Sequence, residues 1–465
     1  MNTSRVNAVQ DDESERALTM TWQATGMFLP LATIAPLALE FVYRRMYSEK
    51  PSLLFDLLDF FLSSAVVAGV AVAARKTRAR AWALIPSLGC AAAVLSAIQW
   101  IAINQNPSYD FGVYRMASSA LLSGASPFPD YTYPPLFAQT LGYVAYVLTH
   151  IAPAGFDIEH VWRLVFYLYQ VVQIGLVGSI FLLLYRMARA LGADTIYATA
   201  IVTLIMLVNT PLQATVGGNQ ANLYVLALSL VALALVDTSA PLAGLATTLG
   251  GMIKVYPSAL IPLWWISGRR TVAIWGVFFA VVLILAYPPL NNWWEFVHFW
   301  TTQSVMSYPG TSDATLLGLI ANGARIVGVA PEGRPPTWIR LVFMSVIVAI
   351  LIWGARRVWR RQQGASDADA HSARVARAIS TAEVLALTLL LSPRAWPHQF
   401  IYAMPLAIVA ATIVPKERRV LVALAGCLIF AFPWSNVFLA SCVRPIGIAL
   451  LLFLTPPHLT PATQS

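Results

Sequence analysis

Long apolar runs recur along almost the whole chain and alternate with short segments rich in Arg, Pro, Gly or Asn. A helix needs about 20 consecutive apolar residues to cross the hydrocarbon core of a bilayer, so each run is a candidate membrane-spanning helix. The pattern predicts an all-α, polytopic transmembrane helix bundle of about 12–14 spans. The candidate spans are residues 20–43, 53–74, 82–103, 162–185, 195–213, 221–237, 241–252, 255–268, 271–288, 337–355, 379–392, 399–414, 419–434 and 436–455.

The basic residues predict how these spans are oriented, because cytoplasmic loops carry an excess of Lys and Arg. With a cytoplasmic N-terminus, residues 104–160, 289–336 and 393–398 fall outside. The charged segment 356–377 falls inside, where we expect it to be solvated. The basic cluster at residues 44–50 disagrees with this topology. The clusters that fall inside are Arg75, Lys76, Arg78 and Arg80; Arg186 and Arg189; Arg269 and Arg270; Arg356, Arg357, Arg360 and Arg361; and Lys416, Arg418 and Arg419.

Two segments do not fit a simple crossing. Residues 133–151 are apolar enough for a span, but a crossing there would move every later Arg-rich loop to the outer face. We therefore expect this segment to lie along the outer interface, or to dip into the membrane and return. Residues 241–252 and 255–268 are each too short to cross, so we expect a broken hairpin with Lys254 near its outer turn.

The composition agrees with a membrane protein. Hydrophobic residues make up 58% of the 465 residues and charged residues 11%, against about 25% charged residues in soluble domains. The net charge of +9 comes from clusters between apolar runs, so we expect no nucleic-acid partner. Cys90, Cys427 and Cys442 lie in or beside apolar runs without metal-ligand spacing, which favours buried free thiols.

Asp110 is the first candidate for chemistry. It follows an apolar run and precedes an amphipathic segment, which places its carboxylate at the mouth of the membrane. A carboxylate in such a low-dielectric site can deprotonate an acceptor hydroxyl. Tyr114 is spaced i, i+4 from Asp110 and would share its face of a helix. The alternative is that Asp110 caps a helix over residues 110–122, and the two roles are not exclusive.

Two cationic groups suit a phosphate. His398 lies at the outer end of a run, next to Arg394 and Trp396, and an imidazole with a guanidinium could bind a phosphate leaving group. The alternative is an interfacial histidine beside an aromatic-belt tryptophan. Lys254 lies inside a long apolar stretch, where ionisable residues are costly and usually functional, although its ammonium could instead snorkel to the interface.

Side-chain amides gather where a run begins, at Asn219, Gln220 and Asn222. Amides hydrogen-bond sugar hydroxyls, and the glycines that precede them allow a close backbone approach. Capping of the following helix is the alternative. Trp396 and Tyr114 complete the candidate substrate-binding residues.

The first outer loop resembles that of glycosyltransferase family 87. The resemblance rests on Asp110 and Tyr114, then Ser-Gly-Ala-Ser-Pro-Phe at residues 123–128 and Tyr-Pro-Pro-Leu at residues 133–136. Three further motifs follow in order and extend the resemblance over roughly residues 82–455. They are Gly-Asn-Gln-Ala-Asn at 218–222, with an extra Asn219; Ala-Gly at 243–244 with Lys254 and Pro257; and Ser-Pro-Arg-Ala-Trp-Pro-His at 392–398, with Ala395 in place of a small hydroxyl residue.

This resemblance implies a membrane fold of GT-C type, with juxtamembrane helices in its outer loops. Residues 81–465 would form the catalytic module, and residues 1–80 a cytoplasmic tail with two additional spans. It also implies a polyprenyl-phosphate mannose donor, with Asp110 as base and His398 beside the donor phosphate. Arg325 matches the arginine of a further pattern, which suggests a second phosphate contact, and an exposed loop charge is its alternative.

We therefore expect an inverting glycosyltransferase in the plasma membrane that acts on an extracytoplasmic lipid or glycan acceptor. Lys254, Arg325 and Arg394 would bind the donor phosphate, and membrane lipids would surround the protein. The sequence requires no cofactor or metal, although a lone Asp beside a lipid phosphate could recruit a divalent ion. A lipid or polyisoprenoid flippase-like transporter and an inactive envelope-assembly subunit are the alternatives.

Overall fold

The computed structural model describes residues 81–103, 108–128, 130–151, 157–286, 290–299, 315–328, 337–366, 370–392, 395–432 and 438–456. These residues form helices, and none of them lies in a strand, which confirms the predicted all-α class. The two spans expected before residue 80 lie outside the described residues, and the division of the chain near residue 80 stays a prediction.

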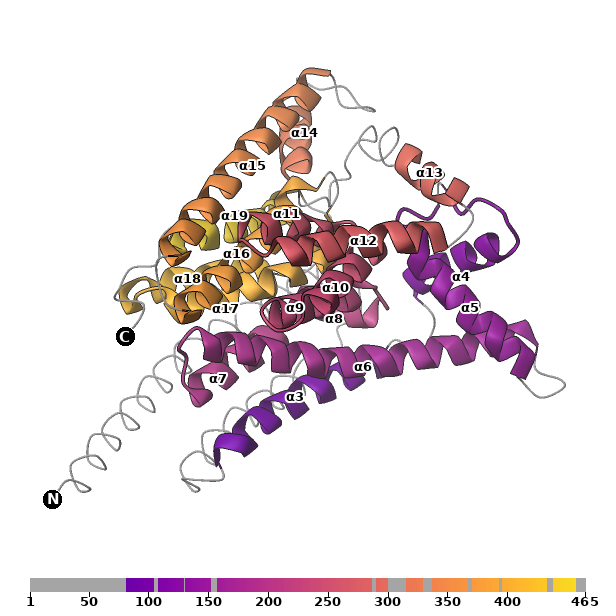
Figure 1. Ribbon diagram of the computed structural model, residues 1–465, viewed down its shortest axis with the longest axis horizontal. Helices are drawn as coiled ribbons and strands as arrows, with labels where there is room; N and C mark the ends of the chain where they lie inside the picture. Colours follow the sequence, from indigo (N-terminus) through magenta and orange to yellow (C-terminus); the bar gives the residue numbers. More distant parts are fainter. Residues whose placement is uncertain are drawn as a thin grey trace.

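Figure 1 shows the order and arrangement of the described helices. They are α3 Ala81–Ile103, α4 Tyr109–Leu122, α5 Pro135–Ile151, α6 Ile158–Ala190, α7 Thr195–Leu207, α8 Thr210–Gly217, α9 Asn222–Leu235, α10 Ala240–Ile253, η1 Tyr256–Ala259, α11 Leu260–Ile266, α12 Arg270–Ala286, α13 Leu290–Phe299, α14 Leu316–Ile326, α15 Thr337–Ser366, α16 Ala370–Leu391, η3 Pro397–Ala403, α17 Met404–Ile413, η4 Lys416–Arg418, α18 Arg419–Gly426, the π-helical turn η5 Cys427–Ala431, and α19 Phe438–Leu454.

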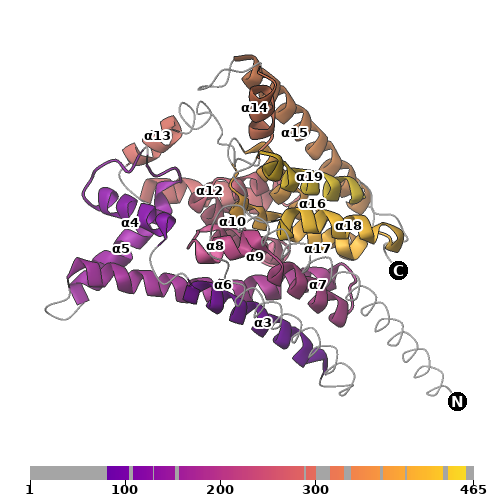
Figure 2. The ribbon, with the colours of Figure 1, turned by 180° about the vertical axis from the view of Figure 1, so that it is seen from behind.

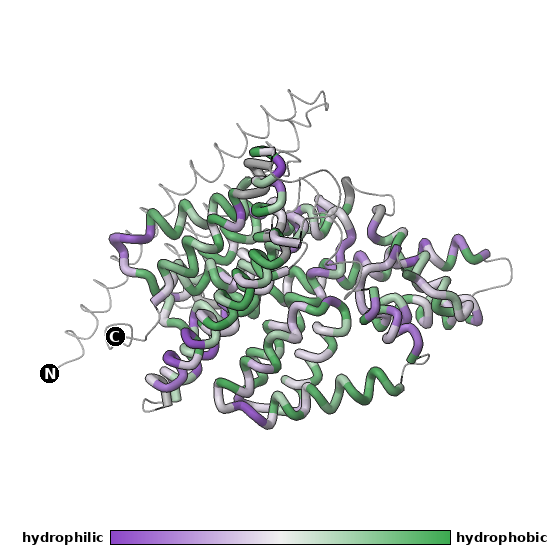
Figure 3. The backbone as a smooth tube through the Cα atoms, turned by 90° about the horizontal axis from the view of Figure 1, so that it is seen from above, coloured by the Kyte–Doolittle hydropathy of each residue, from purple (hydrophilic) through white to green (hydrophobic). Residues whose placement is uncertain are grey.

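Two described helices, Ile158–Ala190 and Thr337–Gly364, are long and apolar enough to cross a membrane. The number rises to four if two bent pairs each count as one span, α7 with α8 (59°) and α12 with α13 (115°). Hydrophobic residues run along most of the helices (Figure 3), as expected for elements that face lipid or one another. The chain is therefore a helical membrane protein, and the larger number of spans stays a prediction.

The packing places α10 at the centre of the molecule. It packs against α9 and α12, while α6 runs along one side with α3 beside it (Figures 1 and 2). Figures 1 and 2 also place α4 and α5 toward one end of the long axis, and the carboxyl ends of α6 and α15 toward the other. Arg186, Arg189, Arg356 and Arg357 lie in the carboxyl-terminal parts of α6 and α15.

The expected break at Lys254 is present. Helix α10 ends at Ile253, Lys254 is extended with φ −146°, and the chain continues into η1. The chain folds back tightly here, because a Cβ added at Gly250 would lie 3.2 Å from the Pro257 side chain.

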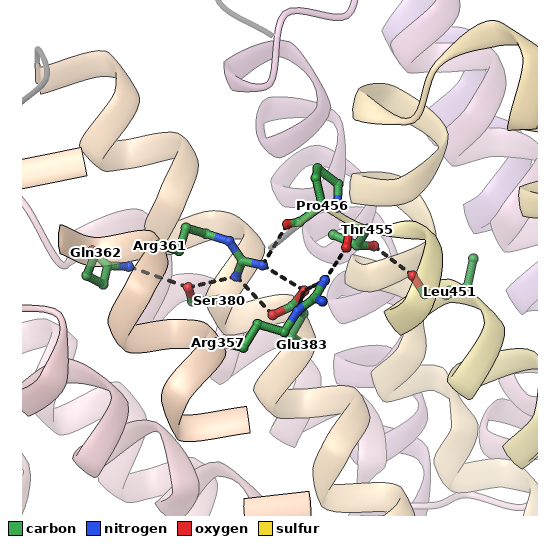
Figure 4. A network of polar contacts seen from close by, with 8 residues as sticks. All are labelled: Arg357, Arg361, Gln362, Ser380, Glu383, Leu451, Thr455 and Pro456. Carbon is green, nitrogen blue, oxygen red and sulfur yellow. Dashed lines mark hydrogen bonds and ion pairs between the residues drawn. The ribbon is translucent and has the colours of Figure 1, made fainter. Parts of the chain in front are cut away.

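The segment 356–377 is helical where the structure describes it, and it is only partly solvated as expected, because Arg356, Arg360 and Arg374 are exposed and other arginines are buried. Helix α15 continues to Ser366, and the Arg361 side chain is fully buried against Glu383 of α16, with 2.9 Å between Nη1 and Oε2. Arg357 donates from Nε to the same carboxylate at 2.9 Å. The Arg residues also donate to the backbone carbonyls of Thr455 and Pro456, so α15, α16 and the end of α19 meet in one buried network (Figure 4). Charge alone predicted exposure, but a buried charge is retained when it is paired.

Candidate active site

Asp110 lies in the first turn of α4 but does not cap the helix. The cap is Ser108, whose hydroxyl accepts from the Phe111 N–H at 3.4 Å and donates to the Gly218 carbonyl at 2.6 Å. The alternative role of Asp110 as an N-cap is therefore wrong. The Asp110 carboxylate can therefore accept from another partner. The Ser108 hydroxyl connects the start of α4 to the segment between α8 and α9.

That partner is Gln220, whose side-chain amide donates from Nε2 to Asp110 Oδ2. Tyr114 contacts the same connection, since its hydroxyl accepts from the backbone N–H of Ala221 at 3.2 Å. The predicted shared face of Asp110 and Tyr114 is thus confirmed. Tyr114 is completely buried, and in this structure its hydroxyl holds the backbone of the α8–α9 connection in place.

The α8–α9 connection has an unusual backbone. Asn219 adopts φ +52°, in the left-handed region that Asn tolerates better than most residues. A Cβ added at Gly218 would lie 2.6 Å from the Ala214 carbonyl oxygen, so only glycine fits there. Tyr169 and Gln173 of α6 donate to the carbonyls of Asn219 and Gln220 at 2.9 and 3.2 Å. The extra Asn219 is therefore accommodated as a fixed turn residue.

Asn222 does not cap α9, because the cap position is Ala221 and it makes no side-chain capping bond. Instead, Asn222 Oδ1 accepts from Lys254 Nζ at 2.7 Å and from the Tyr402 hydroxyl at 2.8 Å. Capping as the role of the amide cluster is thus excluded for Asn222. The amides of Gln220 and Asn222 point to opposite charges, one to Asp110 and the other to Lys254.

Lys254 is 1% exposed, so its ammonium does not snorkel to the surface. Nζ also lies 4.4 Å from the centroid of the Tyr133 ring, a cation–π contact. The ammonium and the Asp110 carboxylate are close enough to interact electrostatically. Asp110 and Lys254, 144 positions apart in the sequence, therefore form one site.

The environment of Asp110 affects its protonation. Helix α4 is not among the candidate membrane-crossing helices. Burial raises the pKa of the Asp110 carboxyl above its usual range, and the nearby positive charge of Lys254 opposes that shift. A carboxylate with a raised pKa is a stronger base, which is what proton abstraction from a hydroxyl requires.

His398 belongs to the same region. It lies in η3, where Thr215 of α8 donates to its backbone carbonyl at 2.9 Å. The side chain is buried within the helices and interacts electrostatically with Lys254 and Arg444. His398 is therefore buried among the helices, whereas the neighbouring Trp396 is 39% exposed.

The other candidates are placed differently. Arg325 is half-buried in the last turn of α14, a helix that packs against α15 and α19. Arg394 lies outside the described residues. Among the residues that the structure describes, no group of three or more His, Cys, Asp or Glu side chains gathers to hold a metal ion.

Sequence reasoning missed three tyrosines and gave no role to one arginine. Tyr133 lies beside the Lys254 ammonium, Tyr402 donates to Asn222, and the Tyr256 hydroxyl donates to Gln399 at 3.1 Å. Arg444 is buried and donates to the carbonyls of Ile429 and Phe432. The signal for Arg444 was available, because an Arg within an apolar run requires buried acceptors. Tyr133 had a signal, because it begins the Tyr-Pro-Pro-Leu motif, whereas Tyr256 and Tyr402 had none, since tyrosine is common in membrane proteins.

A family model described as glycosyltransferase family 87 matches residues 131–393. This match covers more than half of the chain. The chain belongs to glycosyltransferase family 87. The matched part of this glycosyltransferase contains Tyr133, Gln220, Asn222 and Lys254, and it lies within the range expected from the motifs.

Asp110 and His398 lie outside the matched part of the glycosyltransferase, so their assignment depends on the geometry described above. Comparison with the curated proteins and with the solved structures gave no match. A glycosyltransferase of a membrane acts on a sugar donor and an acceptor.

Proposed function

We propose that this glycosyltransferase is an inverting enzyme of GT-C architecture that moves a hexose from a polyprenyl-phosphate donor to an extracytoplasmic lipid or glycan acceptor. The family resemblance favours mannose as the hexose. One observation supports the proposal most strongly: a base and a buried cation interact across the α8–α9 connection. Asp110 accepts from Gln220, and Lys254 donates to Asn222 two residues later. We place the enzyme in the plasma membrane, and the basic clusters favour an orientation with this site on the outer side.

Each group has a role in the proposed transfer. Asp110 accepts the proton of an acceptor hydroxyl as its oxygen attacks the anomeric carbon of the donor sugar. The bond between that carbon and the phosphate oxygen breaks, and its electron pair leaves with the polyprenyl phosphate. Lys254 balances the charge on the leaving phosphate, and the neutral imidazole of His398 would donate a hydrogen bond to it. Preorganised charge of this kind requires no covalent intermediate, which fits inversion at the anomeric carbon.

The direct test is Asp110→Asn, which keeps the shape of the side chain and removes the base. We expect transfer from a radiolabelled polyprenyl-phosphate sugar to fall about 100-fold or more, since general bases contribute roughly 10² to 10⁴ in rate. The matched control is Asp130→Asn, because Asp130 is an exposed aspartate of the same outer loop. Wild-type turnover in the Asp110 variant would contradict the assignment.

A second test addresses the donor. His398→Ala should weaken donor binding or turnover, measured as KM and kcat with the polyprenyl-phosphate sugar varied. Unchanged kinetics would limit His398 to a structural role. Purified, folded wild-type protein that transfers sugar from none of these donors, but moves the lipid across a bilayer without releasing polyprenyl phosphate, would favour the transporter alternative instead.

A further inference from the structure

A cavity of about 370 Å³ lies between the α11–α12 turn, α15 and α16. Its polar lining includes Ser267, Arg269 and Arg377, and Trp359 and Ala373 contribute apolar surface. A volume of this size suits a small molecule or the headgroup of a lipid.

The cavity is positively charged. Arg269 and Arg377 both pair with the Asp237 carboxylate, with 2.6 Å between Arg377 Nη2 and Oδ2, so two guanidinium groups share one acid. Arg374 adds a further positive charge near Arg377. Among the residues that the structure describes, Asp237 is the carboxylate that pairs with these arginines, and it leaves a net positive charge that an anion would offset.

The two lining arginines also retain hydrogen-bonding capacity. The Arg377 side chain is only 5% exposed, yet the Nε–H groups of Arg377 and Arg269 have no acceptor among the described residues. A buried donor without a partner costs about 1–3 kcal/mol, and more when it is charged. An oxyanion bound in the cavity would contact the exposed part of the Arg269 side chain, which is 40% accessible, because guanidinium groups match phosphate oxygens in geometry.

The cavity is separate from the candidate active site. Asp237 precedes the amino end of α10 and Lys254 follows its carboxyl end, which places them roughly 20 Å apart along a helix of this length. Helix α16 separates the same two regions, since Arg377 lies in its first half and Ser392, which contacts Tyr256, follows its carboxyl end. The cavity therefore lies at the opposite end of these helices.

We propose that this cavity binds the phosphate of an anionic phospholipid headgroup. Basic pockets between membrane helices on the cytoplasmic side bind such headgroups, and an exposed tryptophan such as Trp359, with 53% of its surface accessible, is suited to the membrane interface. The site does not depend on the proposed sugar transfer, so lipid binding and activity are tested separately.

The experiment measures lipid binding to the full-length protein in neutral detergent by native mass spectrometry and by thermal shift. Phosphatidylglycerol should bind and raise the melting temperature, and phosphatidylcholine should do neither. Inorganic phosphate is the second arm. If it binds as tightly as phosphatidylglycerol, the ligand is a free phosphate and the lipid assignment is overturned.

Two variants locate the site. Arg269→Gln should weaken phosphatidylglycerol binding about tenfold, which corresponds to about 1.4 kcal/mol. Arg270→Gln is the matched control, because Arg270 is the adjacent residue, stacks on Trp265 and does not line the cavity. If both variants lose phosphatidylglycerol binding equally, the binding depends on general surface charge and the proposal is overturned.

A third variant fills the cavity without changing its charge and covers the case in which Arg269→Gln folds poorly. Ala373 is half-buried in the lining, so Ala373→Phe should block the headgroup and remove the thermal shift by phosphatidylglycerol. Retention of the wild-type shift in a folded Ala373→Phe protein would contradict binding in this cavity.

Discussion

Lys254 is a cation in a part of the molecule where nearly every neighbouring side chain is buried. Its ammonium has one hydrogen-bond acceptor in Asn222, one aromatic face in Tyr133, and the charge of Asp110 nearby. Removing an ammonium from water is costly unless such partners compensate. At the scale of single residues, the candidate site is thus a pair of opposite charges, each oriented by an amide.

The charge pair predicts a change in pH dependence. Burial raises the pKa of Asp110 and Lys254 opposes that shift, so Lys254→Met should raise the pKa of Asp110 further. The base acts only when ionised. Activity falls as the pH drops through its pKa, and the acidic limb of the pH profile of kcat/KM should move to higher pH in this variant. Lys254→Arg keeps the charge and should keep the limb near its wild-type position; an unmoved limb in the Met variant would argue against the pair.

At the scale of elements, the connection between α8 and α9 organises the site. It receives a hydroxyl from Ser108, a hydroxyl from Tyr169 and an amide from Gln173, and it presents Gln220 and Asn222 to the two charges. Because α4 begins at Ser108, the position of Asp110 depends on this connection as well as on α4.

This dependence is testable with Ser108→Ala. The variant loses the N-cap of α4 and the bond to the Gly218 carbonyl, which together should lower the free energy of unfolding by about 1–2 kcal/mol. Sugar transfer should also fall, because Asp110 is no longer held against Gln220. Ser123→Ala at the exposed end of the same helix is the control. Stability can be followed by chemical denaturation in detergent, and equal stability of the two variants would refute the coupling.

At the scale of the whole molecule, polar groups occupy the two ends of a largely apolar bundle. The candidate active site lies beyond the carboxyl ends of α10 and α16, and the paired arginines of α15 and α16 lie toward the opposite end. The carboxylate of Glu383 holds α15, α16 and the end of α19 together through Arg357 and Arg361 (Figure 4).

Glu383→Gln should therefore destabilise the protein by about 3–5 kcal/mol, because two buried guanidinium groups lose their counter-charge. Simultaneous replacement by Arg357→Met, Arg361→Met and Glu383→Leu should recover much of that loss, since no buried charge remains. Glu159→Gln, which breaks an exposed ion pair with Arg115, should leave thermal unfolding almost unchanged. A similar melting temperature for Glu383→Gln and Glu159→Gln would show that the network is not stabilising.

The sequence by itself determined the class and the family of this protein. Apolar runs and low charge are sufficient for a helical membrane protein, because a bilayer leaves the backbone few alternatives to the helix. The break at Lys254 was also predictable, since two short runs flank one ionisable residue. Motif order was sufficient for family 87, whose model matches residues 131–393.

Only the tertiary structure decided what individual polar residues do. By local propensity alone, Asp110 and Asn222 could each cap a helix. By its charge alone, the segment 356–377 could be a solvated loop. What distinguishes the outcomes is which distant partner each side chain meets: Gln220, Lys254 and Glu383. Local sequence carries capping and hydropathy, whereas pairing of buried charges depends on contacts between elements far apart in the chain.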